Sequence, residues 1–509
     1  MLATINSLVL LGIEARPVKV EVDIQSGLPA FELSGLASAA TREARERVRP
    51  AIKNSGFQFP NRRITVNLAP ADFKKEGSHF DLPIALAILL ASEQLVNPLP
   101  DDLFFCGELS LNGELRMVPG ILPMAMEMAR WEIPARFVVP LPNRSEAGLV
   151  HELSSFSAAN LEELCSCLKG EKSLSPAPLF TPDIHNTVPV PDFDEVKGQE
   201  SAKRSLLISA AGMHNVLMIG PPGGGKTMLA RRLPGILPEM SREEILETTR
   251  VYSVAGLLDQ QSPLIQQRPF RSPHRSASMP SIIGGGRIPR PGEISLAQNG
   301  VLFLDEFPEF NRDVLEALRQ PLEDKVVTVA RTQATYTYPA HFSVVASMNP
   351  CPCGHFGSEL ECTCTPLQIQ RYLGRVSGPL LDRMDLHVEV PRVKFDQLRE
   401  GSSGESSASL RQKVILARDI QQQRFKGVKI NVNSQMRPAD LRRYCRLDEA
   451  SHALLKDVFE KLRLSARAYD RVLKIARTIA DLEQSENIQT VHLGEALQYR
   501  SLDRKYWNA

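Results

Sequence analysis

The stretch that decides the fold runs from residue 220 to residue 227 and reads Gly220-Pro221-Pro222-Gly223-Gly224-Gly225-Lys226-Thr227. An apolar run precedes it, so the segment matches a phosphate-binding loop that follows a buried strand. The glycines let backbone N–H groups turn toward phosphate oxygens, Lys226 reaches the β and γ phosphates, and Thr227 offers a hydroxyl to Mg²⁺. We expect Met228 to line the same site. Further motifs follow in order, which favours a nucleoside triphosphate site over a Gly-Pro loop of merely similar sequence.

Two acidic residues follow a second buried strand. Residues 301–304 are apolar and end in Asp305 and Glu306, where a nucleotide-binding sheet presents its carboxylates. We expect Asp305 to hold Mg²⁺ and Glu306 to polarise the attacking water. An ordinary helix start is the alternative, because acidic residues suit a first helical turn. A third strand, 342–346, leads to Asn349, which fits a polar sensor beside the γ-phosphate, so the motifs together favour an ATPase.

Length and composition fit a large enzyme with several cores. The chain has 509 residues, which suggests about three domains, and 43% of them are hydrophobic. Its formal charge of +1 provides no global attraction to nucleic acid or membrane, so any such binding must come from local patches. The apolar runs 8–11 and 82–91 are shorter than the roughly 20 residues that span a bilayer, and the N-terminus lacks a basic signal-peptide start. We expect a cytoplasmic protein with no membrane partner.

Composition also marks domain boundaries. Residues 172–192 are rich in Ser, Thr and Pro and predict a linker between an N-terminal domain, 1–171, and an ATPase core, 193–400. A Gly-Ser-Glu stretch begins the last segment, 401–509. Helical periodicity in this segment predicts a C-terminal helical lid.

Four motifs together resemble AAA+ ATPases, in the branch that contains magnesium chelatase and the MCM helicases. They are the segment Val196-Lys197-Gly198-Gln199, the phosphate loop, the Asp305–Glu306 pair and Asn349. Two further segments are similar to the ComM/YifB family of magnesium-chelatase-like proteins. They are Arg268-Pro269-Phe270-Arg271-Ser272-Pro273-His274 and Ile283-Gly284-Gly285-Gly286-Arg287, the latter followed by Pro289-Arg290-Pro291-Gly292-Glu293-Ile294. This resemblance covers essentially the whole chain and departs at Arg275, where relatives often have a second histidine.

The resemblance implies an α/β fold with a parallel sheet and a helical lid. It also implies an ATP-driven hexameric DNA helicase that migrates DNA branches during recombination, notably when transforming DNA is integrated. ATP and Mg²⁺ would be its cofactors, and its partners would be single-stranded and branched DNA, the other subunits of a homohexamer, and recombination proteins. Two alternatives remain: a magnesium-chelatase motor subunit, and a nucleotide-gated scaffold that remodels a protein partner without moving along DNA.

Two arginines acquire roles from AAA+ proteins. Residues 380–385 resemble the element in which an arginine reaches the γ-phosphate of the neighbouring subunit, so the resemblance implies that Arg383 is a trans finger in a ring. In the lid, residues 465–471 resemble the second sensor, with Arg467 preferred and Arg471 as the reserve. Either lid arginine could instead be a solvated charge on a helix face.

A hairpin is predicted at residues 326–338, where two β-prone runs flank a polar turn. In the helicase relatives a hairpin at this position enters the central pore, which implies that Lys325 and Arg331 contact DNA phosphates. The insertion 268–290 would supply a second pore element. Its DNA contacts would be Arg287 and Arg290. The alternative is that these arginines pair with acidic residues at subunit contacts.

Four cysteines cluster within a short segment. They are Cys351, Cys353, Cys362 and Cys364. Two thiolate pairs around a short loop can form a tetrahedral Zn²⁺ site, although the usual spacing within a pair is two intervening residues and here it is one. His355 could replace one cysteine, and a reduced, metal-free cluster is the alternative. Because the cluster follows the sensor Asn349, such a metal would be structural.

The N-terminal third resembles the proteolytic domain of Lon, through residues 66–91 and 107–114. A Lon protease needs a serine nucleophile activated by a lysine. In this chain the serine position aligns with His79, Ser78 lies one residue away, and the lysine position aligns near Leu122. We therefore expect the protease fold without protease activity. Clustered arginines at 42–49 could mark either a phosphate-contacting surface or a salt-bridged helix face.

Overall fold

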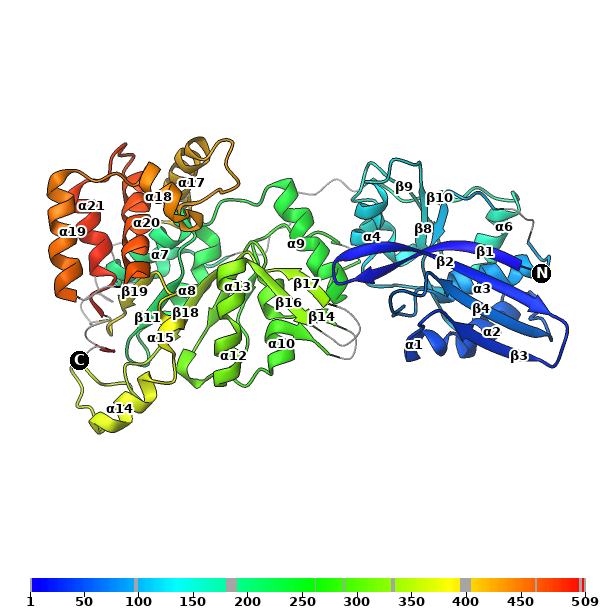
Figure 1. The fold of residues 1–509 in the computed structure, drawn as a ribbon, viewed down its shortest axis with the longest axis horizontal. Coiled ribbons are helices and arrows are strands. Elements are labelled where there is room, and N and C mark those ends of the chain that lie inside the picture. Colours follow the sequence, from blue (N-terminus) through cyan, green and yellow to red (C-terminus); the bar gives the residue numbers. More distant parts are fainter. Residues whose placement is uncertain are drawn as a thin grey trace.

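The computed structural model describes residues 2–95, 99–179, 190–260, 262–286, 289–330, 335–393, 404–462, 465–502 and 506–507. An N-terminal α/β part and a C-terminal helical part lie on opposite sides of a central part built on a parallel sheet (Figure 1). The expected mixed α/β fold with a parallel sheet and a helical C-terminal region is confirmed. Among the described residues, no helix combines the length and apolar character needed to cross a membrane.

A sheet of eight strands forms the N-terminal part. In sheet order its strands are β10 (Ser175–Pro176), β9 (Ser154–Ala158), β8 (Arg136–Pro140), β5 (Leu103–Phe105), β1 (Leu2–Leu11), β2 (Glu14–Gln25), β4 (Arg63–Ala69) and β3 (Ala30–Ser34). Val18, Val20 and Val22 of β2 are buried, while Lys19 between them is exposed, as the two-residue period of a strand dictates. A short hairpin pairs β6 (Glu108–Leu109) with β7 (Leu115–Arg116). Helices cover the sheet: α1 (Ala39–Arg42), α2 (Ala44–Asn54), α3 (Asp81–Ala91), α4 (Ile121–Met128), α5 (Arg144–Ala147) and α6 (Leu161–Leu168).

The side chains around the Lon-like serine position are engaged in packing. The Ser78 hydroxyl donates a hydrogen bond to the Glu108 carboxylate. His79 is buried, and its Nε2 lies 2.9 Å from the carbonyl oxygen of Leu8. The ammonium of the buried Lys75 donates to the Phe73 carbonyl at 2.8 Å. The Lon-like assignment of this part stays a prediction.

Five parallel strands form the central sheet. In sheet order they are β12 (Phe270–Arg271), β15 (Val301–Leu304), β18 (Ser343–Met348), β11 (Val216–Ile219) and β19 (Leu386–Glu389). Every residue of β11, β15 and β18 is buried, because helices cover both faces of such a sheet. The helices of the central part are α7 (Glu200–Gly212), α8 (Lys226–Ile236), α9 (Arg242–Ala255), α10 (Met279–Ile283), α11 (Glu293–Leu296), α12 (Arg312–Ala317), α13 (Arg319–Asp324), α14 (Pro366–Leu373) and α15 (Gly378–Leu381).

Two small hairpins project from the central part. The predicted hairpin is confirmed, since β16 (Val326–Ala330) pairs antiparallel with β17 (Thr335–Pro339). The second joins β13 (Gly284–Gly285) and β14 (Arg290–Pro291) in the insertion. The hydroxyl of Tyr338 on β17 donates to the carbonyl oxygen of Pro289 at 2.9 Å. The two elements expected to reach a pore are therefore in contact.

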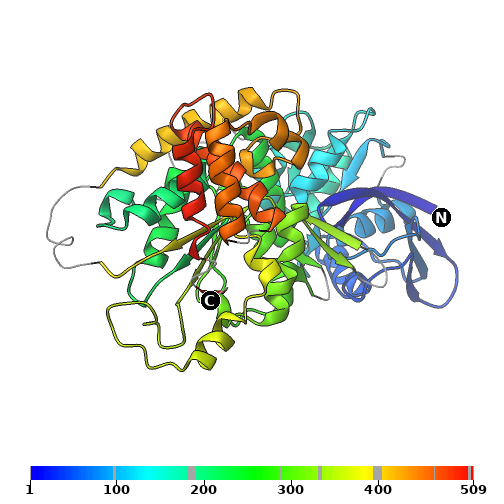
Figure 2. The same cartoon turned by 60° about the vertical axis from the view of Figure 1, so that its left-hand side comes forward.

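The C-terminal part consists of helices stacked on the central part (Figure 2). They are α17 (Ser407–Arg424), α18 (Pro438–Tyr444), α19 (Glu449–Leu462), α20 (Ala466–Leu482) and α21 (Thr490–Gln498). Helix α17 packs on α7 and α8, and α20 packs on α7. Because α8 begins at the phosphate loop, the helical part is coupled to the nucleotide site through direct packing.

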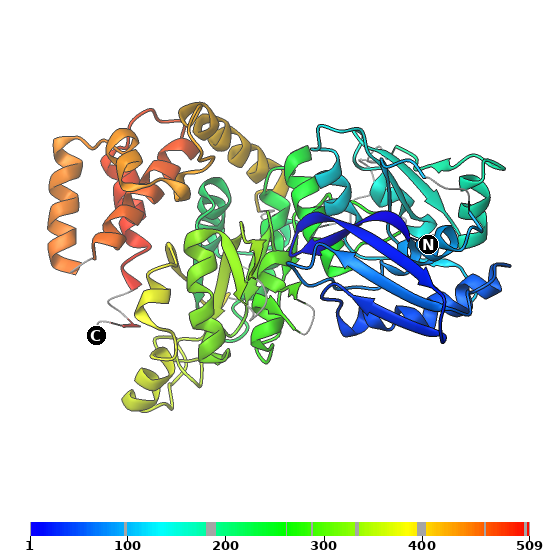
Figure 3. The same ribbon diagram turned by 45° about the vertical axis from the view of Figure 1, so that its right-hand side comes forward.

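The N-terminal part lies beside the central part (Figure 3). Among the described residues, the contacts between these parts include two places. The buried Glu146 carboxylate accepts a hydrogen bond from the Ser253 hydroxyl of α9 at 2.5 Å, and the Gly120 N–H donates to the Ser253 carbonyl at 3.1 Å. At the second place, the β1–β2 turn packs on the β16–β17 hairpin. A side chain at Gly12 would lie 3.4 Å from the carbonyl oxygen of Thr337. The N-terminal part therefore supports the hairpin directly.

Candidate functional site

The phosphate loop leaves the end of β11 and enters α8. Gly223 and Gly225 have φ angles of 77° and 85°, in the left-handed region that favours glycine. The Lys226 ammonium bends back over the loop and donates to the Gly220 carbonyl at 2.6 Å and to the Pro221 carbonyl at 3.0 Å. It also lies 3.2 Å from Oδ1 of Asn349. The lysine and the predicted sensor, 123 residues apart, thus share one site.

Oxygen ligands suited to a magnesium ion lie beside the loop. The Thr227 hydroxyl donates to Oδ2 of Asp305 at 2.8 Å. The Ser347 hydroxyl, which the sequence did not single out, donates to the other carboxylate oxygen of Asp305. Hydroxyl and carboxylate oxygens are ligands that Mg²⁺ prefers. Thr227 and Asp305 therefore fit the ion, and Ser347 orients the carboxylate.

A pocket of about 450 Å³ brings the predicted residues together. It is lined by Pro222, Gly223, Gly224, Gly225, Lys226, Thr227, Met228, Asp305, Glu306, Ser347, Met348 and Asn349. The acids come from the end of β15 and Asn349 from the end of β18, because parallel strands end at the same edge of the sheet. Burial lowers the pKa of Lys226 to about 8, although Asp305 and Glu306 oppose this shift.

Glu306 follows Asp305 in a left-handed conformation, with a φ of 52°. Its carboxylate Oε2 lies 2.6 Å from Nη1 of Arg275. Both side chains are about half exposed. Arg275 is the position at which the sequence departs from the family pattern, and no sequence signal indicated that it would reach the catalytic carboxylate.

Arg383 is buried within its own subunit. Its Nη1 donates to the Pro379 carbonyl at 2.5 Å and its Nη2 pairs with the Glu323 carboxylate. Only 7% of the residue is exposed. The guanidinium must therefore leave Glu323 before it can reach a phosphate on a neighbouring subunit, and its trans role stays a prediction.

The two lid arginines differ in their surroundings. Arg467 is exposed in the first turn of α20. Arg471, one turn later, is largely buried, and its Nε lies 3.2 Å from Oδ1 of Asp385. Arg467 is thus free to turn toward a ligand, whereas Arg471 holds the lid against Asp385, the residue before β19.

Of the four expected DNA contacts, Arg331 and Arg287 lie outside the described residues. Arg290 is exposed on β14. Lys325 lies at the base of the β16–β17 hairpin with a φ of 58°, and burial lowers its pKa. Lys325 is therefore placed to orient the hairpin more than to grip a phosphate at its tip.

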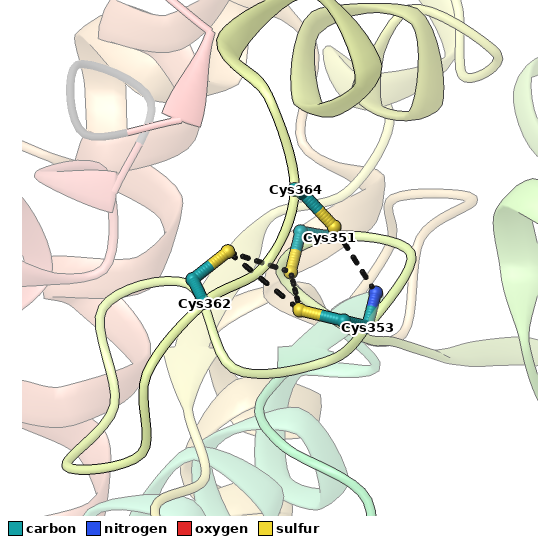
Figure 4. A group of neighbouring side chains, drawn as sticks. All are labelled: Cys351, Cys353, Cys362 and Cys364. Atoms are coloured by element: carbon teal, nitrogen blue, oxygen red, sulfur yellow. Dashed lines mark hydrogen bonds between the residues drawn. The ribbon is translucent and has the colours of Figure 1, made fainter.

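The four cysteines converge on one point (Figure 4). The Cys351 sulfur lies 3.3 Å from that of Cys353 and 3.8 Å from that of Cys362, and the sulfurs of Cys353 and Cys362 are 3.6 Å apart. All four ligand atoms, including that of Cys364, lie within 4.8 Å of one another. Zinc bonds of about 2.3 Å to tetrahedral thiolates separate the sulfurs by about 3.8 Å. The geometry fits a zinc ion.

The cysteine loop also touches the phosphate loop. Gly354 has a φ of 84°, and a Cβ on it would lie 2.5 Å from Cδ of Pro222. On its other side the loop places Phe356 against Tyr506, with ring centroids 6.3 Å apart. The cysteine cluster therefore connects the nucleotide pocket to the C-terminal end of the chain.

Comparison with protein families matches three segments of the chain. The family described as "Magnesium chelatase, subunit ChlI" matches residues 192–398, and "Magnesium chelatase, subunit ChlI C-terminal" matches residues 404–500. "Subunit ChlI of Mg-chelatase" matches residues 20–143. The nucleotide pocket and the cysteine cluster both lie inside the first of these segments.

Individual relatives extend the similarity to the whole chain. The protein YifB of Salmonella typhimurium is 46% identical over 504 residues, which cover 99% of this chain and 98% of that protein. Competence protein ComM of Haemophilus influenzae is 45% identical over 517 residues, with the same shares of 99% and 98%. The magnesium-chelatase 38 kDa subunit of Rhodobacter capsulatus is 27% identical over 183 residues, which cover 32% of this chain and 51% of that protein.

Proposed function

This chain belongs to the ComM/YifB family of magnesium-chelatase-like proteins, and on that premise we propose that it is an ATP-hydrolysing DNA helicase that drives branch migration during recombination. The pocket that joins the phosphate loop, Asp305, Glu306 and Asn349 carries the proposal. The name of the Haemophilus relative, a competence protein, supports a role in integrating DNA during natural transformation.

The residues of the pocket divide the chemistry of ATP hydrolysis among them. Backbone N–H groups of the loop and the Lys226 ammonium bind the phosphates. Thr227 and Asp305 hold Mg²⁺, which when bound neutralises charge on the β and γ phosphates. The Glu306 carboxylate accepts a proton from the attacking water, and Asn349 positions the γ-phosphate. Glu306 can act as this base only after it separates from Arg275.

A ring completes the site in our proposal. Arg383 of one subunit leaves Glu323 and stabilises the charge on the phosphates held by the next subunit, and repeated contacts of this kind close a homohexamer. Arg467 of the lid contacts the nucleotide whose phosphates Arg383 reaches. Since α17 of the lid packs on α8, a change at the phosphates moves the lid and the neighbouring subunit together.

Movement along DNA is assigned to the two hairpins in contact at Tyr338. We propose that Arg290, with Arg331 and Arg287, contacts phosphates of single-stranded or branched DNA.

The cysteine cluster would hold a structural zinc ion that fixes the loop after Asn349. The N-terminal part, a Lon-like fold without protease activity, buttresses the β16–β17 hairpin through its β1–β2 turn. We propose the domain boundaries that the sequence predicts and the cytoplasm as the compartment.

The test is displacement of a labelled strand from a mobile three- or four-way DNA junction by the purified full chain. We expect displacement with ATP and none without it. Lys226→Ala should abolish displacement, whereas the matched control Lys456→Ala, on the exposed surface of the lid, should retain it. ATP hydrolysis without displacement would overturn the helicase and favour a chelatase-like or scaffold ATPase that remodels a protein partner.

A further inference from the structure

A strongly basic surface lies on the helical lid, away from the nucleotide pocket. Between residues 425 and 447 the chain has six cationic side chains and a single acidic one, Asp440. The cationic side chains are Lys426, Lys429, Arg437, Arg442, Arg443 and Arg446, and all six are exposed. We call this set the lid basic patch. Since the whole chain has a formal charge of only +1, the patch is a local concentration of positive charge.

The cations of the patch are not neutralised by neighbours. Within the part of the chain that the structure describes, none of the six forms an ion pair. The Asp440 carboxylate is used locally, since it accepts a hydrogen bond from the Arg437 backbone N–H at 2.9 Å. Just beyond the patch, the Asp448 carboxylate accepts the Ser451 N–H at 2.8 Å and, within the described residues, forms no ion pair with the six cations. Unpaired exposed cations at this density indicate an anionic partner.

Packing holds the two halves of the patch together. The loop that carries Lys426 and Lys429 is joined to α18 by the rings of Phe425 and Tyr444, whose centroids are 5.5 Å apart. The guanidinium of Arg443 lies 5.0 Å from the centroid of the Tyr444 ring. An arginine against a half-exposed tyrosine offers both a charge for phosphate and a flat surface for a base.

The patch is anchored to the base of the pore hairpin. Nε2 of Gln435 lies 2.7 Å from Nε2 of His341, which stands between β17 and β18. The Lys474 ammonium donates to the Ser434 carbonyl at 2.8 Å. Both contacts lie at the end of the sheet opposite to the phosphate loop. The segment that carries the patch therefore lies beside the base of the β16–β17 hairpin.

From these observations we infer that the lid basic patch binds the phosphate backbone of nucleic acid. The inference rests on the proposed function and deepens it, because it names a second DNA contact outside the pore hairpins. An arginine beside a partly exposed aromatic ring and the contact with the hairpin base favour nucleic acid over an acidic protein. The patch would retain a strand while the hairpins release it between ATP cycles.

The test measures binding of a fluorescent single-stranded oligonucleotide by anisotropy, without ATP, over a series of salt concentrations. The variant is Arg442→Gln with Arg443→Gln, and the matched control is Lys456→Gln with Lys461→Gln on α19 of the same lid. We expect at least about tenfold weaker binding for the arginine variant at moderate salt. Its slope of log K against log salt should be smaller by about 1.4, since each phosphate contact on a single strand contributes about 0.7. The control should match the wild type.

The same titration is made with a labelled poly-glutamate peptide. Three outcomes would overturn the inference: equal oligonucleotide affinities of the arginine variant and the wild type, equal losses of oligonucleotide affinity in variant and control, or an arginine variant that loses affinity for the peptide alone. The last result would identify an acidic protein as the partner. Junction displacement with ATP is measured separately on the same proteins. If the wild type displaces strands but the arginine variant binds the oligonucleotide as tightly as the wild type, this inference is wrong and the proposed function stands. If oligonucleotide binding depends on the patch but the wild type displaces no strand, the proposed function is wrong and nucleic-acid binding by the patch stands.

Discussion

The guanidinium of Arg275 lies 2.6 Å from the carboxylate of Glu306, which lines the nucleotide pocket. A carboxylate that accepts a hydrogen bond from an arginine must leave that arginine before it can reach a water on the γ-phosphate. We therefore expect the pair to restrain ATP hydrolysis until the two side chains separate. Arg275 belongs to the insertion that carries the proposed DNA contacts, so we expect DNA binding to make that separation.

We expect Arg275→Ala to raise ATP turnover without DNA by several-fold and to reduce the further stimulation by DNA. Arg375→Ala is the matched control, because Arg375 pairs with Glu309 at 2.7 Å and is similarly exposed. Phosphate release measured with and without single-stranded DNA separates the two variants. Loss of turnover in Arg275→Ala would show that the arginine assists catalysis instead of restraining it.

Binding of ATP should be linked to a proton on Lys226. Burial lowers the pKa of this lysine to about 8 in the nucleotide-free protein, and the phosphates of ATP stabilise its charged form. Below pH 8 the lysine is protonated before and after binding, so affinity is steady. Above pH 8 binding must take up a proton, so affinity should fall by up to about tenfold per pH unit.

Titration calorimetry in buffers of different ionisation enthalpy measures this proton uptake directly. Lys226→Arg provides the control, because a guanidinium stays charged throughout the range. If this variant binds ATP, titration of the side chain at position 226 should not change its affinity for ATP between pH 7 and pH 9. A pH-independent affinity in the wild type would contradict the assignment.

The sequence predicts the nucleotide pocket well for a topological reason. Parallel strands end at one edge of a sheet, so a phosphate loop, an acidic pair and a polar sensor at three strand ends must meet there. The β16–β17 hairpin is likewise predicted by local pattern. Contacts that depend on how loops fold back are not predicted by local sequence pattern. The Arg275–Glu306 pair and the contact of Gly354 with Pro222 join segments through tertiary packing.

Arg383 shows a second limit of prediction from the sequence. Its motif identifies the arginine but not the partner that occupies it within one subunit, Glu323. Lys325 shows the same limit, because the resemblance to helicase relatives implies a phosphate contact, whereas burial at the hairpin base lowers the pKa of its side chain. Long charged side chains choose among several partners, and only the assembled fold decides which one they meet.

Zinc should be present in the protein at about one ion per chain, held by four thiolates. We expect Cys362→Ser to lower the metal content to under about a tenth and to reduce the melting temperature. It should also weaken ATP binding, because the cysteine loop touches Pro222 of the phosphate loop. Metal analysis, thermal unfolding and ATP titration test the three effects. Cys167→Ser, at a half-buried thiol outside the cluster, should change none of them.

Arg383 should act across a subunit boundary, and mixing experiments can show this. Arg383→Ala should retain ATP binding but lose hydrolysis, and Lys226→Ala should lose both. When the two inactive variants are mixed and reassembled, about a quarter of the interfaces in a random ring combine an intact Lys226 with an intact Arg383 from the neighbour. We therefore expect partial recovery of hydrolysis, toward about a quarter of the wild-type rate where sites act independently. A mixture of Lys226→Ala with the Lys226→Ala, Arg383→Ala double variant should stay inactive. Full activity of Arg383→Ala alone would leave the guanidinium with a structural role, as the partner of Glu323 that holds α13 against α15.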